Sequence, residues 1–304
     1  MSAEEKQQGY RTGVLLARAQ AGPAASDLVV NESRLGVRLR RSLGSDQSLR
    51  VLETDSRENL NETAARLRAT GRYEFVEPDY VVKADATPND PRFLAGDQWG
   101  LRNGGQENGT AGADIKAEEA WEIQSSATNV IVAIVDSGIR RTHEDLAANL
   151  WVNAGESVFA GNNRDDDGNG YVDDLNGINS TLPAKTPGNG NPIDAVGHGT
   201  AVASVIGAAG DNRLGMTGVA WNAKLMALRF LDPDGYGYVS DEIECIDYAI
   251  AKGAHLINAS FGGSAYSQSL FAALKRARDA GIIVVCSAGN DAENSDVVPH
   301  YPSG

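Results

Sequence analysis

The chain has 304 residues, of which 27 are Lys or Arg and 41 are Asp or Glu, so its net charge is −14. This length predicts about two domains with room for a sizeable core, and a hydrophobic content of 41% excludes wholesale disorder. The negative charge argues against a nucleic-acid binder, which needs a basic surface, and against docking on an anionic membrane. No apolar stretch is long enough to span a bilayer, and no secretory signal opens the chain.

The negative charge belongs to the second part of the chain. Residues 1–86 hold 13 basic and 13 acidic side chains, whereas residues 87–304 hold 14 and 28. We therefore expect a domain boundary near residue 87, where the turn-rich stretch 84–91 reads as a linker. Before it, the pattern predicts a small α+β domain. Its strands are expected at 13–17 and 50–53, its helix at 58–69, and two more strands within 73–83, separated at Pro78 because proline cannot donate to a β-ladder.

The second part alternates apolar runs with amphipathic stretches. Strands are expected at 130–135, 224–230, 255–261 and 281–288, and helices at 200–209, 240–252 and 267–280. Buried strands that alternate with helices indicate an α/β fold with a doubly wound parallel sheet. Cys245 and Cys286 lie in apolar stretches without metal-type spacing, which favours two buried thiols and leaves a disulfide between them open.

Candidate functional residues follow several of these elements. Asp136 closes the first strand, in DSGI (136–139), and His198 lies in GHGT (197–200), where Thr200 can cap the following helix. SFGG (260–263) and SAGN (287–290) each follow a buried strand. In a parallel sheet such strand ends collect at the edge where ligands bind. Each motif alone also has a purely structural explanation as a turn or a cap, so their order along the chain carries the argument.

The order Asp, His and then Asn after a buried strand resembles the subtilisin-like serine proteases (subtilases). Their triad runs Asp, His, Ser along the chain, and an Asn completes the oxyanion hole. The resemblance implies that Asp136 and His198 are catalytic and that Asn290 donates to the oxyanion. It also implies that an extended peptide substrate pairs with the main chain at these strand ends. The residues expected there are Ser260, Phe261, Gly262, Ala288 and Gly289.

The same resemblance assigns roles to the two domains. Residues 1–86 resemble the inhibitory propeptide of the family, whose tail at 81–84 would lie across the cleft like a product. Residues 87–304 resemble its peptidase domain, which starts at TPNDPRF (87–93). Members of the family are secreted, although no signal peptide is visible here. The expected partners are polypeptide substrates and the propeptide itself, and we expect a monomer.

One departure concerns the nucleophile. The family's serine lies in a Gly-Thr-Ser motif well beyond the Asn, and this motif does not occur in the 304 residues. Ser287, Ser295 and Ser303 do not match it, so we expect this chain by itself to be inactive and its peptidase domain to be C-terminally incomplete. Two functions follow: a calcium-stabilised serine endopeptidase, or a truncated or degenerate subtilase that binds calcium or peptide without cleavage. A nucleotide-binding protein is disfavoured, because no GxGxxG or GxxxxGK[ST] opens the first helix.

An acidic insertion between Asp136 and His198 predicts a calcium site. The stretch DDDGNGYVDD (165–174) holds five acids within ten residues, which repel one another unless a cation is present. Its spacing fits the start of an EF-hand loop, although Asn176 stands where that loop has a bidentate Glu. Hard oxygen ligands at this density favour Ca²⁺ over a transition metal. Some subtilases carry a similar insertion. The expected ligands are Asp165, Asp167, Asn169, Tyr171, Asp173 and Asp174.

A second calcium site is implied by the resemblance alone. Asp90, Asp145 and Asn212 match positions that ligate calcium near the mature N-terminus of family members. The sequence separates these three residues widely, so spacing says nothing about whether they meet.

Overall fold

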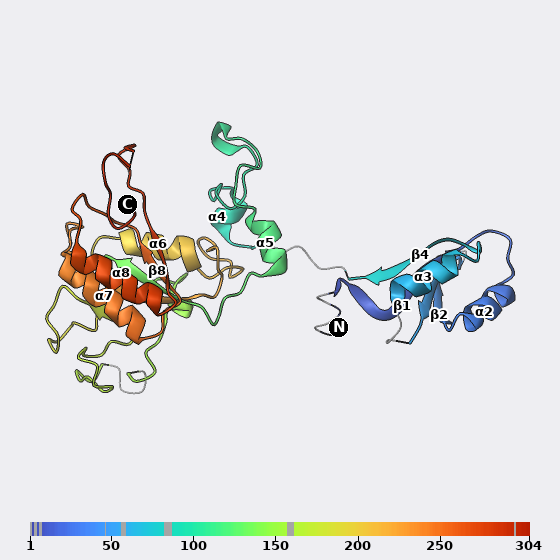
Figure 1. Ribbon diagram of the computed structural model, residues 1–304, viewed down its shortest axis with the longest axis horizontal. Coiled ribbons are helices and arrows are strands. Elements are labelled where there is room, and N and C mark those ends of the chain that lie inside the picture. The colour runs from blue at the N-terminus through green and yellow to red at the C-terminus, as the bar shows by residue number, and fades with distance from the viewer. Residues whose placement is uncertain are drawn as a thin grey trace. The chain divides into compact units, whose positions relative to one another are not determined.

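The computed structural model of the protein describes residues 2, 5, 8–45, 47–55, 59–81, 87–156, 161–294 and 296–304 (Figure 1). The chain separates into two compact units, Met1–Ala84 and Asp85–Gly304. Several expectations lie outside the described residues: the linker at 84–86, the propeptide tail at 82–84, the helix start at Glu58, and Ser295. Within the described part, no helix combines the length and the apolar character that crossing a membrane requires.

The first unit is a four-stranded antiparallel sheet with two helices. The strands β1 (Tyr10–Ala19), β2 (Arg38–Leu43), β3 (Leu49–Glu53) and β4 (Tyr73–Tyr80) lie in the order β2-β3-β1-β4. Helices α2 (Ala25–Arg34) and α3 (Leu60–Arg68) share an apolar core with the sheet. The side chain of Asn59 caps α3 by accepting from the N–H groups of its first turn. The sequence predicted β1, β3 and α3, whereas α2 and β2 were not predicted.

The prediction that Pro78 divides two strands is wrong. Strand β4 continues through Pro78, which lies opposite Leu15 of β1. Two features make this possible. Strand β4 is at the edge of the sheet, so it has a free side on which a residue without an N–H group costs no ladder bond. The register of β1 against β4 also shifts between Tyr10 and Leu15, next to the proline.

A buried ion pair joins α2 to the sheet of the first unit. The guanidinium of Arg50 (β3) donates to Glu32 (α2) through two hydrogen bonds of 2.6 and 2.8 Å. The hydroxyl of Tyr73 (β4) donates to the same carboxylate at 3.0 Å. The side chains of Arg50 and Glu32 are only 5% and 1% exposed. Every oxygen of Glu32 is therefore paired, as a buried charge requires.

The second unit is built on a five-stranded parallel sheet, which confirms the predicted α/β class. Its strands are β5 (Ile131–Asp136), β6 (Gly177–Asn179), β7 (Lys224–Arg229), β8 (Leu256–Ala259) and β9 (Ile283–Cys286), in the order β6-β7-β5-β8-β9. The four predicted strands correspond to β5, β7, β8 and β9. Strand β6 lies inside the Asn- and Gly-rich insertion, where the apolar pattern is too short to predict it.

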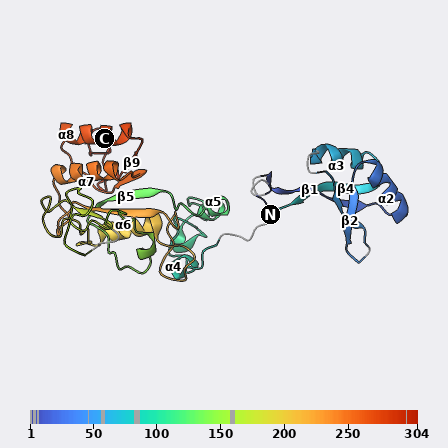
Figure 2. The ribbon, with the colours of Figure 1, turned by 90° about the horizontal axis from the view of Figure 1, so that it is seen from below.

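Helices cover both faces of this sheet. Figure 2 shows α7 (Val239–Ala251) and α8 (Gln268–Asp279) on one side and α6 (His198–Gly207) on the other. Helices α7 and α8 bury residues such as Ile246 and Ala273 in one apolar cluster, and α6 buries Ala203 in a second. The short helices α4 (Pro91–Leu94) and α5 (Ala117–Ile123) pack Phe93 and Trp121 together in a small satellite cluster. This arrangement leaves the carboxyl ends of β5, β8 and β9 side by side at one edge.

Both cysteines are free thiols. Cys245 on α7 is fully buried, with its Sγ atom 3.3 Å from Oγ of Ser180, and burial raises its pKa. Cys286 at the end of β9 is half-buried, and burial raises its pKa as well. The disulfide that the sequence left open is therefore absent.

Candidate active site

Asp136 and His198 meet at the carboxyl edge of the parallel sheet. Asp136 ends β5 and is fully buried, whereas the side chain of His198, the first residue of α6, is 50% exposed. The Nδ1 atom of His198 lies 2.8 and 3.0 Å from the two carboxylate oxygens of Asp136. Because a carboxylate accepts, Nδ1 carries the hydrogen, and Nε2 is left to act as a base.

Small residues allow this close approach of two distant segments. A Cβ atom on Gly199 would lie 2.2 Å from the carbonyl oxygen of Gly138 and 3.0 Å from Oδ1 of Asp136. Gly138 itself has φ of +105°, and a Cβ there would lie 2.4 Å from the carbonyl oxygen of Pro192. The glycines of DSGI and GHGT are thus required where the turn after β5 and the start of α6 touch.

The start of α6 is capped by a residue that the sequence analysis missed. Asp194 accepts hydrogen bonds from the backbone N–H groups of Val196, Gly197 and Thr200. The expectation that Thr200 caps the helix is wrong. Because the helix already begins at His198, Thr200 lies within its first turn, where its hydroxyl donates to Asp194 and accepts from the N–H of Arg140.

The two glycine-containing strand ends lie next to each other. Ala259 of β8 pairs with Cys286 of β9, and the N–H of Ser287 donates to the carbonyl of Ala259 at 3.0 Å. The hydroxyl of Ser287 donates to the carbonyl of Phe261, two residues beyond Ala259, at 3.2 Å. The expected substrate-binding residues at these ends are half-buried (Ser260, Phe261) or exposed (Gly262, Ala288, Gly289), and Asn290 is exposed. Strand β5 pairs with β8, so these ends and Asp136 share one edge of the sheet.

His300 was not predicted, yet its imidazole ring lies against both strand ends. A Cβ atom on Gly262 would lie 2.0 Å from the ring, and one on Gly289 would lie 3.1 Å from it. The neighbouring Tyr301 exchanges two backbone hydrogen bonds, of 2.9 and 2.8 Å, with Gly263. Only the fold brings these residues together, since no motif in the sequence marks them.

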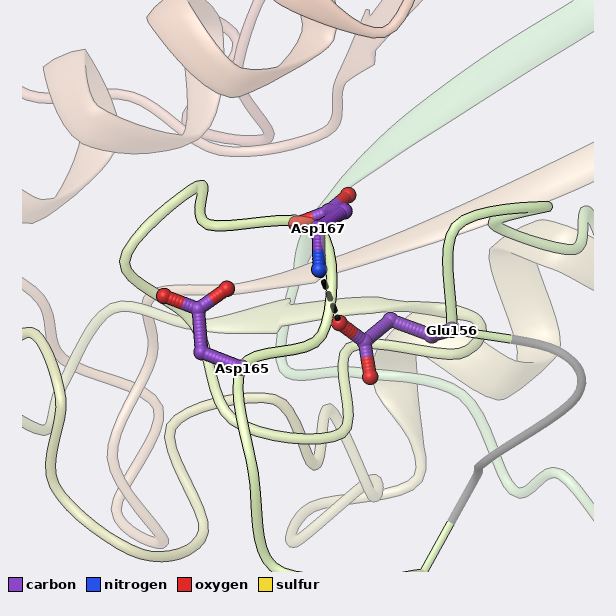
Figure 3. Close-up of side chains that lie close together, drawn as sticks. All are labelled: Glu156, Asp165 and Asp167. Carbon is purple, nitrogen blue, oxygen red and sulfur yellow. Dashed lines mark hydrogen bonds between the residues drawn. The ribbon is translucent and has the colours of Figure 1, made fainter.

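The acidic insertion brings three carboxylates together, one of which the sequence analysis missed. One oxygen each of Glu156, Asp165 and Asp167 lies within 4.8 Å of the others, around one turn of the loop (Figure 3). Glu156 is fully buried, and its Oε1 atom accepts from the N–H groups of Asp166 and Asp167. Its Oε2 atom is buried without a partner. Burial, with the charges of Asp174 and Asp167 adding to it, raises the pKa of Glu156, although the N–H donors oppose this.

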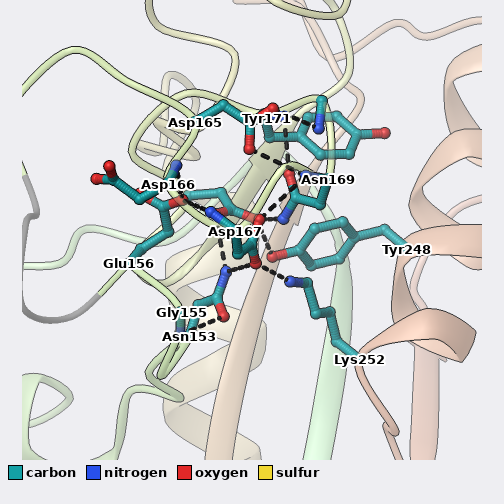
Figure 4. A network of polar contacts seen from close by, with 12 residues as sticks. Asn153, Gly155, Glu156, Asp165, Asp166, Asp167, Asn169, Tyr171, Tyr248 and Lys252 are labelled. Carbon is teal, nitrogen blue, oxygen red and sulfur yellow. Dashed lines mark hydrogen bonds and ion pairs between the residues drawn. The ribbon is translucent and has the colours of Figure 1, made fainter.

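The other expected ligands of the insertion hold the loop in shape. The carboxylate of Asp173 accepts from the N–H groups of residues 161–163. Asp174 is buried and accepts from Asn153, Asn169 and the hydroxyl of Tyr248, the three donors being labelled in Figure 4. Tyr171 donates its hydroxyl to Glu244 of α7. Asp167 in turn accepts from the ammonium of Lys252 at 2.6 Å, so the insertion is anchored on α7.

The three residues of the second expected calcium site also meet. Asp145 accepts from the amide of Asn212 at 2.8 Å, and Asp90 accepts from the N–H of Asp211 at 2.7 Å. Asp90 is fully buried, and its Oδ1 atom has no partner. Burial and the nearby charge of Asp145 raise the pKa of Asp90. An unpartnered, buried carboxylate oxygen next to a second carboxylate fits a cation at this place.

Comparison with known proteins places this chain in a family. Residues 127–304, more than half of the chain, match the family described as the Subtilase family. Subtilisin-like protease 1 of Plasmodium vivax is 38% identical over 163 residues, which are 54% of this chain and 25% of that protein. The cell wall-associated protease of Bacillus subtilis (strain 168) is 33% identical over 255 residues, 83% of this chain and 25% of its own length.

The extracellular protease of Xanthomonas campestris pv. campestris is 31% identical over 296 residues, which are 93% of this chain and 47% of that protein. The chain thus spans between a quarter and about half of the length of these three relatives. The parallel sheet of the second unit and the family match agree on the same α/β architecture. This chain belongs to the subtilase family, the subtilisin-like serine proteases.

Proposed function

We propose that the protein is a serine endopeptidase of the subtilisin type, in which Asp136 and His198 form the acid–base pair of the triad. The contact of 2.8 Å between Nδ1 of His198 and Asp136, in a chain of this family, carries the proposal. The remaining member of the triad is the serine of a Gly-Thr-Ser motif, which the 304 residues do not contain. These residues therefore supply the base, its orienting carboxylate and the oxyanion donor.

In the reaction, Nε2 of His198 takes the proton of the serine hydroxyl as that oxygen attacks the peptide carbonyl carbon. The same atom then gives the proton to the leaving amine, and a water molecule repeats the sequence to release the acid product. Asp136 holds the tautomer with hydrogen on Nδ1 and stabilises the imidazolium that forms. The complete burial of Asp136 supports this role, since solvent screens a buried carboxylate less than an exposed one.

The strand ends after β8 and β9 bind the substrate in this proposal. Ser260 to Gly262 and Ala288 to Gly289 present main-chain groups to an extended peptide, which adds to the sheet as a further strand. Asn290 donates its side-chain amide to the oxyanion of the tetrahedral intermediate. The exposure of Gly262, Ala288, Gly289 and Asn290 supports this assignment, because a substrate must reach them.

Two calcium ions stabilise the proposed enzyme. Glu156, Asp165 and Asp167 would hold one, and Asp90, Asp145 and Asn212 the other. The unpartnered oxygens of Glu156 and Asp90 support both sites, since each lies buried without the partner that its charge requires. Bound calcium supplies positive charge that holds each set of carboxylates together, and it takes no part in the proton transfers. In this proposal residues 1–86 are the propeptide that inhibits the enzyme until it is removed.

The proposal is tested by joining residues 1–304 to the Gly-Thr-Ser segment of a subtilase. The joined chain is expected to react with a fluorophosphonate probe and to hydrolyse casein, whereas residues 1–304 alone are expected to do neither and to remain uncleaved near 84–89. His198→Ala should lower kcat by about 10⁶ and Asn290→Ala by about 10²–10³, the losses measured in subtilisin, a member of this family.

His255→Gln is the matched control. His255 lies before β8, at the opposite edge of the sheet, where Nδ1 accepts from the N–H of Ile131. This variant is expected to leave kcat unchanged. A joined chain that folds but is neither labelled nor active would instead favour a subtilase that binds peptide or calcium without cleaving.

A further inference from the structure

Besides Asp136, a second carboxylate lies near the start of α6. It is that of Asp194, and both of its oxygens accept hydrogen bonds. It accepts from the backbone N–H groups of Val196 and Gly197, which precede the helix, and from both the N–H and the hydroxyl of Thr200 in its first turn. Its Oδ1 atom also accepts from the hydroxyl of Ser137 at 2.8 Å. Burial raises the pKa of Asp194, but the hydrogen bonds outweigh it and hold the pKa below its ordinary value, so the group is charged at neutral pH.

These contacts tie together the two segments that carry the catalytic pair. Ser137 directly follows Asp136, and its hydroxyl, while donating to Asp194, accepts from the N–H of Gly199 at 2.9 Å. Gly199 directly follows His198. Hydrogen bonds thus connect Ser137, the residue after Asp136, to Asp194. Asp194 in turn accepts from Gly197 and Thr200, which lie on either side of His198 in the sequence.

Neighbouring backbone contacts reinforce this connection. The N–H of Ile139 donates to the carbonyl of Pro192 at 3.0 Å, and the N–H of Arg140 donates to the hydroxyl of Thr200 at 3.0 Å. The side chain of Ser137 is fully buried. Removing the carboxylate would leave the hydroxyl of Ser137 and the N–H and hydroxyl of Thr200 short of a partner in a partly buried place, which costs more than the loss of one exposed hydrogen bond.

A charge argument points in the same direction. His198 is the first residue of a ten-residue helix, and the positive end of a helix dipole disfavours a cation at that position. The base must become an imidazolium during the reaction. A charged carboxylate at the same helix end offsets the unfavourable field.

We infer that Asp194 is a positioning residue that holds the His198 ring against Asp136, through Ser137 and the first turn of α6. The inference rests on the proposed function, in which this pair is catalytic, and it adds a residue outside the triad. Asp194 touches neither Asp136 nor His198 directly in the hydrogen-bond network, so it acts through the backbone that carries them.

Proton NMR of the 304-residue protein tests this inference without requiring peptidase activity. A hydrogen on Nδ1 of His198 bonded to Asp136 gives a low-field resonance, which Asp136→Asn and His198→Gln should remove. Asp194→Ala is expected to raise the exchange rate of this hydrogen with water at least tenfold. Asp194→Asn retains one acceptor oxygen and should raise the rate less, and Ser137→Ala breaks the same connection from its other end.

Asp232→Ala is the matched control. Asp232 is also half-buried, follows β7 at the same edge, and accepts from the N–H groups of Asp234 and Tyr236. Its variant should lower the melting temperature as loop capping is lost, yet leave the resonance unchanged. An unchanged resonance in folded Asp194→Asn and Ser137→Ala proteins would overturn the inference. Absence of any Asp136-dependent resonance in the wild-type protein would contradict the catalytic pair itself, and the inference with it.

Discussion

The carboxylate of Glu156 accepts a hydrogen bond of 3.3 Å from the N–H of Asp167, while the side chain of Asp167 lies in the same cluster. The loop therefore holds two carboxylates close together by its own backbone. Such proximity costs free energy through repulsion, which the ammonium of Lys252 beside Asp167 offsets in part and a bound cation would offset further. The stability of the second unit should consequently depend on calcium.

Removal of calcium is expected to lower the melting temperature of the second unit. At a free calcium concentration 100 times Kd, one site adds about 2.7 kcal/mol to the free energy of unfolding. For a unit of this size such a change corresponds to roughly 5–10 °C per site. Calorimetry with and without a chelator measures the shift. Added Ca²⁺ should restore it and Mg²⁺ should not, because Mg²⁺ requires a stricter octahedral geometry. An identical melt in chelator would contradict both sites.

Glu156→Gln should have opposite effects with and without calcium. Without calcium, the neutral amide removes a buried charge whose pKa is raised, so the variant should melt at the same or a higher temperature than the wild type. With calcium, it should lose most of the stabilisation attributed to the insertion. Calcium titration followed by calorimetry measures both. Asp166→Asn is the control, because Asp166 is an exposed acid of the same loop that accepts from Asn162. Equal responses of the two variants would exclude Glu156 as a ligand.

The pH dependence of stability should contain a contribution from Glu242 on α7. This residue is 5% exposed, and burial raises its pKa from 4.5 to about 7. Between these values the folded state binds the proton more strongly than the unfolded state, so stability falls as pH rises from 4.5 to 7. The cost above pH 7 is roughly 3 kcal/mol.

Glu242→Gln should remove this pH dependence and stabilise the protein at pH 8 by up to about that amount. Urea unfolding at pH 5 and pH 8, followed by the fluorescence of the tryptophans in the second unit, provides the comparison. Asp234→Asn, a change at an exposed acid of the preceding loop, should leave the difference between the two pH values unaltered. If Glu242→Gln keeps the wild-type difference in unfolding free energy between pH 5 and pH 8, groups other than Glu242 cause that difference.

The buried pair of Glu32 and Arg50 should dominate the stability of the first unit. Arg50→Met leaves the carboxylate of Glu32 buried without its cation, which costs about 3–5 kcal/mol. The double variant Glu32→Leu/Arg50→Met should recover much of this loss, because no charge is then stranded. Hydrogen exchange of peptides from β1 and β3 in the complete chain measures the change. Arg38→Met is the control, because it breaks an exposed ion pair with Glu53 and should cost less than about 1 kcal/mol. Equal losses of stability in Arg50→Met and Arg38→Met would contradict this ranking.

The sequence predicted the parts of the fold that local patterns specify. Runs such as 130–135 and 281–288 are apolar enough to be buried on both faces, and they became β5 and β9. Strand β6 was missed because it is only three residues long, and helix α2 because Leu28 and Glu32 are its only buried residues, so tertiary contacts decide their structure. Pro78 was misjudged for a related reason: whether a proline ends a strand depends on whether that strand lies at the edge of its sheet.

For the candidate site, the sequence by itself determined the residue types and their order: Asp136, His198 and Asn290, each next to a recognisable element and in the order of a known family. Only the tertiary structure decided which distant side chains touch. It brings Asp136 and His198 into contact across 62 positions, adds Asp194 to them, and places Glu156 beside the acidic insertion. The physical reason is that motifs record local backbone requirements, whereas a buried carboxylate is matched by whatever donor or cation the folded chain brings to it.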